Sequence, residues 1–421
     1  MHHFHYKHSR LHCEDVDLGE VADAVGTPAY VYSTATLTRH VRVIGEAFTD
    51  VPCLIAFSVK ANGNLGVLKT LGALGCGADV VSGGELQRAM AAGIPASKIV
   101  FSGVGKTKME MALALNAGIH QFNVESEAEL EALSDVAAAA GATAPIALRV
   151  NPDVAAGGHP NISTGKAGDK FGVPWSEAER LYRRAAELPG LEAVGVDVHI
   201  GSQIGELGPM EAAFERTVGL ARRLIDQGHD IRRLDLGGGL GIPYAETDAP
   251  ATPAAYAAMV RRVVGDLPVE VILEPGRVIA GNAGVLLTEA LFTKDAPDRS
   301  FLIVDAGMND LMRPALYSAH HDILPLSEAA AGAATQTYDI VGPICESTDK
   351  FAAARDLPSI APGERLAFLS AGAYGAVLSS QYNARPLAPE VLVNGASYAI
   401  VRKRPTFDEM VALEEIPDWL T

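Results

Sequence analysis

The feature that most constrains the fold is a series of eight short apolar runs, separated by amphipathic stretches, in the first two thirds of the chain. The runs are rich in β-branched residues and end at Gly or polar residues, which is typical of buried parallel strands. The stretches between them, such as 84–93, 125–141 and 209–228, begin with acidic or capping residues and end at Gly, as helices prefer. The runs cover residues 53–59, 78–82, 98–103, 120–125, 146–151, 194–201, 232–239 and 269–276.

Eight consecutive strand–helix units predict an α/β fold with a closed, TIM-like (β/α)8 barrel. A doubly wound open sheet is the alternative, and the unit count favours closure. After Gly281 the pattern changes to strand-like runs joined by turns, which indicates a C-terminal all-β domain. The segment "TPAYVYS" (27–33) is a candidate for another strand of that domain. We therefore expect a barrel over residues 36–282 and a β domain formed by 1–35 and 283–421.

Composition narrows the function class. The net charge of −17 and the lack of a Lys/Arg-rich block argue against nucleic-acid binding, which requires clustered cations. The four cysteines are irregularly spaced without a CxxC pair, which favours a reduced, cytoplasmic compartment. We expect no signal peptide and no membrane span, since no long apolar run is present. The His-rich start, "MHHFHYKHSR", is interpreted as a strand start in preference to a metal site.

Polar residues follow the predicted strands, and barrel enzymes carry their chemistry at this position. The glycines 237–239 follow the seventh strand, where backbone N–H groups can form an anion nest near strands seven and eight. A tight turn is the equally simple alternative. A dinucleotide fingerprint is excluded because Ile242 stands where Gly or Ala is required. The stretch "GVGKT" (103–107) is not a P-loop, because Val100 replaces its first Gly.

Lys60 ends the first apolar run, and a desolvated amine there loses its proton more easily and becomes a nucleophile toward carbonyls. A solvated surface lysine is the alternative. Together with a phosphate nest, Lys60 indicates a phosphate-bearing aldehyde, pyridoxal 5′-phosphate. Glu274, after the eighth strand, is suited to keep the pyridine nitrogen protonated, and His199 to stack on the ring. A metal site of His199, Glu274, Asp235 and Asp197 is a further alternative, although their spacing fits no compact ligand motif, and we expect none.

The chain resembles the fold-type III pyridoxal-phosphate decarboxylases, and within them the diaminopimelate branch. The resemblance also implies the two-domain architecture of alanine racemase. The matching stretches run nearly end to end. "HIGSQI" with "EPGR" indicates the wider family, and "MNDLMRPALY" with "CES" indicates the diaminopimelate branch. The other matching stretches include "FSVKAN", "GADVVSGGEL", "LDLGGGLGIPY" and "AGAYGAVLSSQYNARP".

The resemblance implies that Lys60 forms the Schiff base with the cofactor and that Glu274 pairs with its ring nitrogen. It implies that His199 stacks on the ring. The other residues that it places around the cofactor are Asp79, Ser202, Gly237, Gly238, Gly239, Pro275, Gly276, Arg277 and Tyr374.

For the substrate, the resemblance implies that Cys345 donates a proton after CO2 leaves and that Glu346 holds the distal ammonium group. It implies that the remaining substrate contacts come from Arg277, Arg313, Tyr317 and Tyr374. Forked guanidinium groups suit carboxylate binding better than lysine does. Cys345 and Glu346 are expected to reach the neighbouring subunit of a homodimer with shared active sites. The insert 159–172 is expected to act as a lid.

The implied reaction is decarboxylation of meso-2,6-diaminopimelate to L-lysine and CO2, the last step of lysine biosynthesis. Alternatives are a decarboxylase of another basic amino acid such as ornithine, or an amino-acid racemase on the same barrel. A small pyridoxal-phosphate homeostasis protein would lack the β domain. A non-catalytic regulator would be expected to have lost Lys60 or the Cys345–Glu346 pair, and this chain has both.

Overall fold

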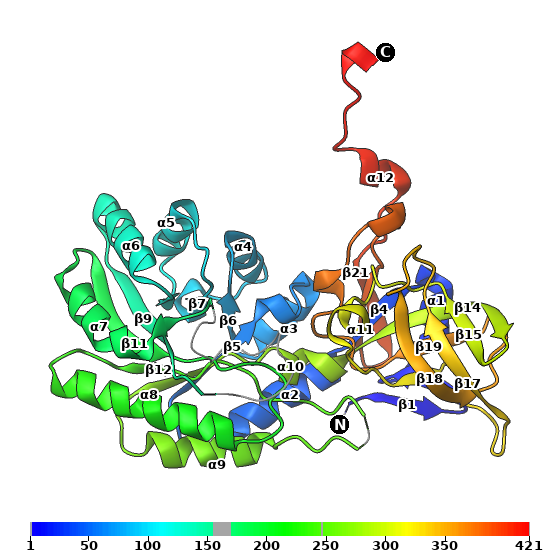
Figure 1. The fold of residues 1–421 in the computed structure, drawn as a ribbon, viewed down its shortest axis with the longest axis horizontal. Coiled ribbons are helices and arrows are strands. Elements are labelled where there is room, and N and C mark those ends of the chain that lie inside the picture. The colour runs from blue at the N-terminus through cyan, green and yellow to red at the C-terminus, as the bar shows by residue number, and fades with distance from the viewer. Residues whose placement is uncertain (1, 155–169, 246, 421) are drawn as a thin grey trace. The chain divides into compact units, whose positions relative to one another are not determined.

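The computed structural model describes residues 2–154, 170–245 and 247–420 of the 421-residue chain. The chain divides into two compact units. One unit comprises Leu37–Ala280, and the other combines Met1–Thr36 with Gly281–Thr421. Each unit is described by itself below (Figure 1).

The first unit contains the predicted closed barrel of eight parallel strands. Closure is shown by the pairing of β13 with β5, which joins the last strand to the first. The open-sheet alternative is therefore wrong. The short strand β10 (Val173–Pro174) adds to β9 outside the ring. The eight strands are β5 (Cys53–Ser58), β6 (Gly77–Val80), β7 (Ile99–Phe101), β8 (Gln121–Val124), β9 (Ala144–Asn151), β11 (Leu191–Asp197), β12 (Arg233–Asp235) and β13 (Glu270–Leu273).

Helices alternate with these strands, and their ends follow the capping signals of the sequence (Figure 1). Ser82 and Ser126 cap α4 and α6 through their hydroxyls, and Thr107 with Glu110 forms a capping box on α5. Gly141 ends α6 in the left-handed conformation. The helices are α2 (Thr34–Ala47), α3 (Leu65–Ala73), α4 (Gly83–Ala91), α5 (Lys108–Ala117), α6 (Glu127–Ala140), α7 (Ala178–Glu187), α8 (Gly208–Asp226), α9 (Pro253–Val264) and α10 (Arg277–Ala280).

The second unit is rich in β-strands, as expected. Its main sheet has the order β18-β17-β15-β14-β4-β20-β21, with β19 paired to β14 and β16 paired to β19. The candidate strand at 27–33 is β4 (Ala29–Ser33), antiparallel to β14 and parallel to β20. The other strands of this sheet are β14 (Gly284–Ala296), β15 (Arg299–Val304), β16 (Ile323–Pro325), β17 (Thr335–Val341), β18 (Lys350–Pro358), β19 (Arg365–Phe368), β20 (Glu390–Asn394) and β21 (Ser397–Arg402).

The His-rich N-terminus forms a strand, as the sequence indicated. β1 (Phe4–Lys7) pairs with β2 (Arg10–Cys13), and β2 with β3 (Val16–Asp17). Among its described residues this unit also contains the α-helices α1 (Leu18–Val25), α11 (Arg313–Tyr317) and α12 (Phe407–Val411). All four cysteines are free. Across the described residues, no helix is both long enough and apolar enough to cross a membrane.

Candidate active site

The barrel interior changes from apolar to polar along the strands, and the side-chain period of a strand explains why. Leu54, Ala56, Val100 and Ile272 form an apolar cluster inside the ring. Residues two positions apart on a strand share a face. The next inward positions after this cluster are therefore Ser58, Ser102 and Glu274, all buried. A polar layer thus begins at the carboxyl ends of the strands, where barrel enzymes carry their chemistry.

Lys60 lies directly after β5, in a short 3-10 turn (Val59–Ala61). Its Nζ donates to Oδ2 of Asp79 at 2.9 Å, and Asp79 is fully buried at the end of β6. Ser58 Oγ lies 2.7 Å from the same oxygen. The lysine side chain is 36% exposed. The amine is therefore paired with a buried carboxylate, which favours its ammonium form, whereas the sequence suggested an amine in apolar surroundings.

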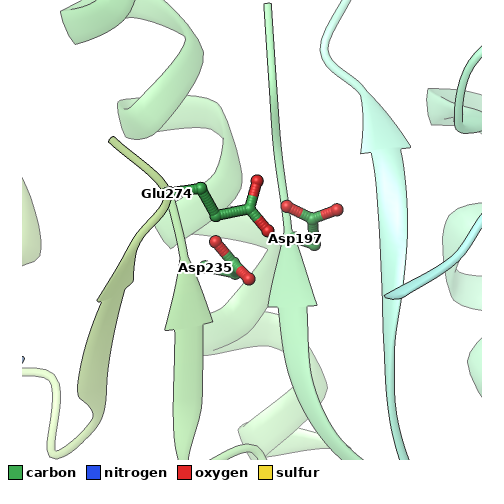
Figure 2. A group of neighbouring side chains, drawn as sticks. All are labelled: Asp197, Asp235 and Glu274. Atoms are coloured by element: carbon green, nitrogen blue, oxygen red, sulfur yellow. The ribbon is translucent and has the colours of Figure 1, made fainter. Parts of the chain in front are cut away.

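Three buried carboxylates gather beside this pair, and Figure 2 shows them converging from neighbouring strand ends. One carboxylate oxygen from each of Asp197, Asp235 and Glu274 lies within 4.8 Å of the other two. Burial and the neighbouring carboxylates raise the pKa of Asp197 and of Glu274 well above the usual range. Burial raises the pKa of Asp235 to about 6. Carboxylates this close share protons, so the cluster holds fewer than three charges near neutral pH.

His199 follows β11 and accepts a hydrogen bond at Nδ1 from the Gly238 N–H group at 3.1 Å. Burial, with Arg149 and Lys60 nearby, lowers the pKa of His199 well below its usual value. The imidazole is therefore neutral at physiological pH, and the proton that it carries is on Nε2.

The glycine loop after β12 turns the chain, and its backbone N–H groups also hydrogen-bond two side chains of the site. Gly237 N–H donates to Asp235 Oδ1 at 3.0 Å, so two of the three N–H groups are bound by Asp235 and His199. The predicted anion nest stays a prediction, and these two contacts show where the Gly237 and Gly238 N–H groups point in this structure. Glycine is still required here, because a Cβ at position 238 would lie 2.3 Å from the Glu274 carbonyl oxygen. Gly239 has φ +107, a conformation that L side chains rarely adopt.

Arg277, at the start of α10, contacts the loops that follow β11 and β12. Its Nη2 donates to Ser202 Oγ at 3.0 Å, and its Nη1 donates to the Tyr244 hydroxyl. The guanidinium also lies 5.7 Å from the centre of the Tyr244 ring. Gly276 and Pro275 lie between Glu274 and this arginine in the sequence. Lys60, Asp79, His199, Ser202, Glu274 and Arg277 thus all lie at the carboxyl end of the barrel.

Several residues of this layer were missed by sequence reasoning. Tyr244 lies in "GIPY", just beyond the glycine loop, and Arg149 is buried at the end of β9 with Nη1 3.4 Å from Glu125 Oε1. Ser102 and Asn123 contact Glu274 from β7 and β8. The sequence offered only their position as a signal, since each of these residues lies at or near the end of a predicted strand. The inward direction of their side chains required the register of the barrel.

The predicted substrate residues of the second unit form their own groups. Arg313 begins α11, is buried, and its Nη1 lies 2.8 Å from His321 Nε2. His321 Nδ1 in turn lies 2.8 Å from the Leu369 carbonyl oxygen. Tyr317 ends α11, and Tyr374 is half-buried with φ +55. His321 was not identified from the sequence.

Cys345 and Glu346 lie together on an exposed segment between β17 and β18. The Cys345 N–H group donates to Asn383 Oδ1 at 3.2 Å. Thr348 Oγ1 lies 3.0 Å from Glu346 Oε1, and Glu346 hydrogen-bonds Tyr382. The expected lid at 159–172 lies outside the described residues, except for its last three positions.

Comparison with known proteins identifies the family of this chain. A family model described as "Pyridoxal-dependent decarboxylase, pyridoxal binding domain" matches residues 34–281, and the barrel is thereby that of a pyridoxal-dependent decarboxylase. The diaminopimelate decarboxylase of Pseudomonas aeruginosa is 50% identical over 98% of this chain and 99% of its own length.

Two solved structures are similar over nearly their whole length. The Helicobacter pylori diaminopimelate decarboxylase complexed with L-lysine is 39% identical, with a TM-score of 0.91 over 94% of this chain and 99% of that one. The M. jannaschii enzyme in complex with L-lysine is 35% identical, with a TM-score of 0.94 over 99% of both chains. This chain belongs to the diaminopimelate decarboxylase family.

Proposed function

We propose that this chain uses pyridoxal 5′-phosphate to decarboxylate meso-2,6-diaminopimelate to L-lysine and CO2. The observation that carries this proposal is the layer at the carboxyl end of the barrel. There the Lys60 amine pairs with the buried Asp79, beside Glu274 and its two neighbouring carboxylates. Membership of the diaminopimelate decarboxylase family specifies the substrate. When bound, the cofactor supplies a sink for the electrons released as CO2 leaves.

The residues present fit this cofactor. Four buried carboxylates, Asp79, Asp197, Asp235 and Glu274, lie in this layer. Lys60 lies close enough to Glu274, and Arg149 to Asp197, to offset part of their charge. A protonated ring nitrogen at Glu274 supplies positive charge where the cluster lacks it. The same oxygens could surround a metal ion. We favour the ring nitrogen because Lys60, the residue that this chemistry requires for covalent attachment, lies in the same layer.

Within this proposal, Lys60 attaches the cofactor and Asp79 holds the amine in place until attachment. His199, fixed through its Nδ1 by Gly238, presents a neutral ring to the cofactor face. A neutral ring is required there, because a second cation beside the pyridinium would oppose its protonation.

We assign the cofactor phosphate to the loops that follow β11, β12 and β13. Ser202 is held by Arg277, and Gly239 brings bare backbone close to the carbonyl oxygen of Gly201. We assign Gly276, which directly precedes Arg277, to the same site. Gly237 and Gly238 support this site indirectly, through Asp235 and His199. We assign Tyr374 as a further phosphate contact and Pro275 as part of the same loop.

Substrate recognition requires groups for two carboxylates and a distal ammonium. We assign the carboxylates to Arg277, Arg313, Tyr317 and Tyr374, because guanidinium groups bind carboxylates with two parallel hydrogen bonds. We assign the distal ammonium to Glu346. An ornithine decarboxylase would need no arginine for a second carboxylate, so Arg313 supports the diaminopimelate assignment.

We assign the proton donor after CO2 release to Cys345. Cys345 and Glu346 are exposed in the single chain, which supports a role at the site of a neighbouring subunit. We therefore propose a homodimer in which each active site takes Lys60 from one subunit and Cys345 from the other. The β unit would then contribute both to the substrate site and to the dimer interface.

The product is L-lysine, so the reaction is the last step of lysine biosynthesis. We propose that it takes place in the cytoplasm, where the four free cysteines remain reduced. A thiol that must donate a proton in every cycle also requires such a compartment.

The test is CO2 release by the purified enzyme from meso-diaminopimelate, L-ornithine, L-arginine and L-lysine, measured side by side. We expect release from meso-diaminopimelate alone, with L-lysine formed in equal amount. Release from ornithine without release from diaminopimelate would overturn the substrate assignment. Interconversion of amino-acid enantiomers without CO2 would support a racemase instead.

A further inference from the structure

One oxygen of Glu274 is fixed by two donors from neighbouring strands. Ser102 Oγ lies 3.2 Å from Glu274 Oε1, and Asn123 Nδ2 lies 3.3 Å from the same atom. The three side chains are buried, Asn123 completely. Asn123 Nδ2 also lies 3.2 Å from Ser102 Oγ, so the two side chains contact each other as well as Glu274.

The Asn123 amide also holds the neighbouring carboxylate. Its Nδ2 donates to Asp235 Oδ2 at 3.0 Å. Its Oδ1 accepts from Gln121 Nε2 at 2.8 Å, which fixes the NH2 group on the side of the carboxylates. Gln121 and Asn123 alternate along β8 and share its inward face. A single amide therefore bridges Asp235 and Glu274.

We propose that Ser102 and Asn123 are positioning residues for decarboxylation, which aim the Glu274 carboxylate at the cofactor nitrogen and hold it beside Asp235. This inference rests on the proposed function. Neither side chain is assigned a contact with substrate or cofactor. Both act through Glu274 Oε1, and Asn123 acts through Asp235 as well.

The physical need for such a bridge is charge repulsion. Two carboxylates at this distance repel each other unless they share a proton or accept from a common donor. An N–H donor between them stabilises the ionised forms and fixes the rotamer of each. Without it, Glu274 is free to turn away from the ring nitrogen, and protonation of that nitrogen is weakened. The raised pKa of Glu274 is consistent with this crowding.

The test compares three variants: Ser102→Ala, Asn123→Leu, and Ser134→Ala as the matched control. Ser134 is as buried as Ser102, each being 3% exposed. Its hydroxyl donates to the Pro189 carbonyl oxygen at 2.8 Å, away from the carboxylates. Asn123→Leu nearly preserves the side-chain volume and removes the NH2 group that donates to Glu274 and Asp235. The readouts are kcat and KM for diaminopimelate, cofactor affinity by titration of the apoenzyme, and the visible absorption spectrum of the bound cofactor.

We expect Ser102→Ala to lower kcat by about tenfold and to leave KM within about twofold, since one buried donor is lost. Asn123→Leu should lower kcat further, and both variants should alter the spectrum. Ser134→Ala should match the wild type in kcat and in spectrum. Should Asn123→Leu fail to fold, Ser102→Ala decides the question.

A Ser102→Ala variant indistinguishable from Ser134→Ala in kcat and in spectrum would overturn the inference. A wild-type enzyme inactive on diaminopimelate would refute the proposed function instead. In that case the spectrum and cofactor affinity of the same variants still decide whether Ser102 and Asn123 position Glu274.

Discussion

Lys60 Nζ lies 2.9 Å from Asp79 Oδ2, and this ion pair joins a half-exposed amine to a fully buried carboxylate on the next strand. Ser58 Oγ contacts the same carboxylate oxygen. The amine that the chemistry requires is therefore held in place before the cofactor arrives, by a group whose own burial is costly.

That pairing predicts the stability of cofactor-free variants. Lys60→Ala leaves Asp79 without its cation and should lower the free energy of unfolding by about 1–2 kcal/mol, a reduced value because the lysine is partly exposed. Adding Asp79→Asn should restore most of the loss. Urea unfolding at neutral pH measures both. Lys7→Ala, which breaks an exposed pair with Asp15, is the control and should change little.

The ion-pair account would be contradicted by a Lys60→Ala/Asp79→Asn protein that is no more stable than Lys60→Ala alone. Removing the buried charge would then not have raised the free energy of unfolding.

The carboxylate cluster predicts how stability changes with pH. The pKa of Asp235 is raised from 3.8 to about 6, so between these values the folded protein binds more protons than the unfolded chain. The free energy of unfolding of the cofactor-free protein should therefore fall as pH rises through this window, by up to ~1.4 kcal/mol per pH unit for one proton. The raised pKa of Glu274 acts in the same direction and extends the effect to higher pH.

Asp235→Asn removes one of these groups and should flatten the fall between about pH 4 and pH 6. Asp266→Asn is the control, because Arg222 lowers the pKa of that exposed carboxylate and its titration lies below the window. Denaturation at several pH values measures the slope. Equal slopes for wild type and Asp235→Asn would show that Asp235 does not titrate there.

The Arg313–His321 contact predicts a change in substrate affinity. With Nδ1 at the Leu369 carbonyl oxygen, His321 presents Nε2 as the acceptor for Arg313. His321→Phe removes this acceptor and should raise KM for diaminopimelate about tenfold with a smaller change in kcat. His320→Phe is the control, because His320 is exposed and pairs with Asp322. A larger loss in kcat than in substrate affinity would argue against a binding role for Arg313.

Shared active sites predict rescue between two inactive variants. Lys60→Ala and Cys345→Ala subunits, mixed and allowed to exchange, should form heterodimers with one intact site out of two. Half of the dimers are mixed at equal concentrations, so about a quarter of the wild-type activity should return. No return of activity, with exchange confirmed by differently tagged subunits, would show that each site is built from one chain.

The barrel could be predicted from the sequence because its signals are local. Each strand is an apolar run, and helix starts such as Ser126 and stops such as Gly141 lie within a few residues of it. Strand β4 was recognisable as a strand, but its partners β14 and β20 lie far along the chain, so only the structure shows its pairing.

The site could be predicted less completely. Strand ends identified Lys60, Glu274 and Arg277, but not what each one contacts. An apolar strand suggested a desolvated Lys60, whereas its environment is set by Asp79 on the next strand. The direction of the Gly237 and Gly238 N–H groups depends on positive-φ backbone and on tertiary packing, which the sequence does not display.

The central claim is that Lys60 carries the cofactor, and borohydride reduction of the holoenzyme followed by peptide mass mapping tests it most directly. Lys106 is the internal comparison, since it is a buried lysine of the same barrel held by Glu129 at 2.7 Å. The account predicts one reduced pyridoxyl group per chain, on the peptide that contains Lys60, and none on Lys106. A group on any other lysine, or none on a protein that binds the cofactor, would contradict it.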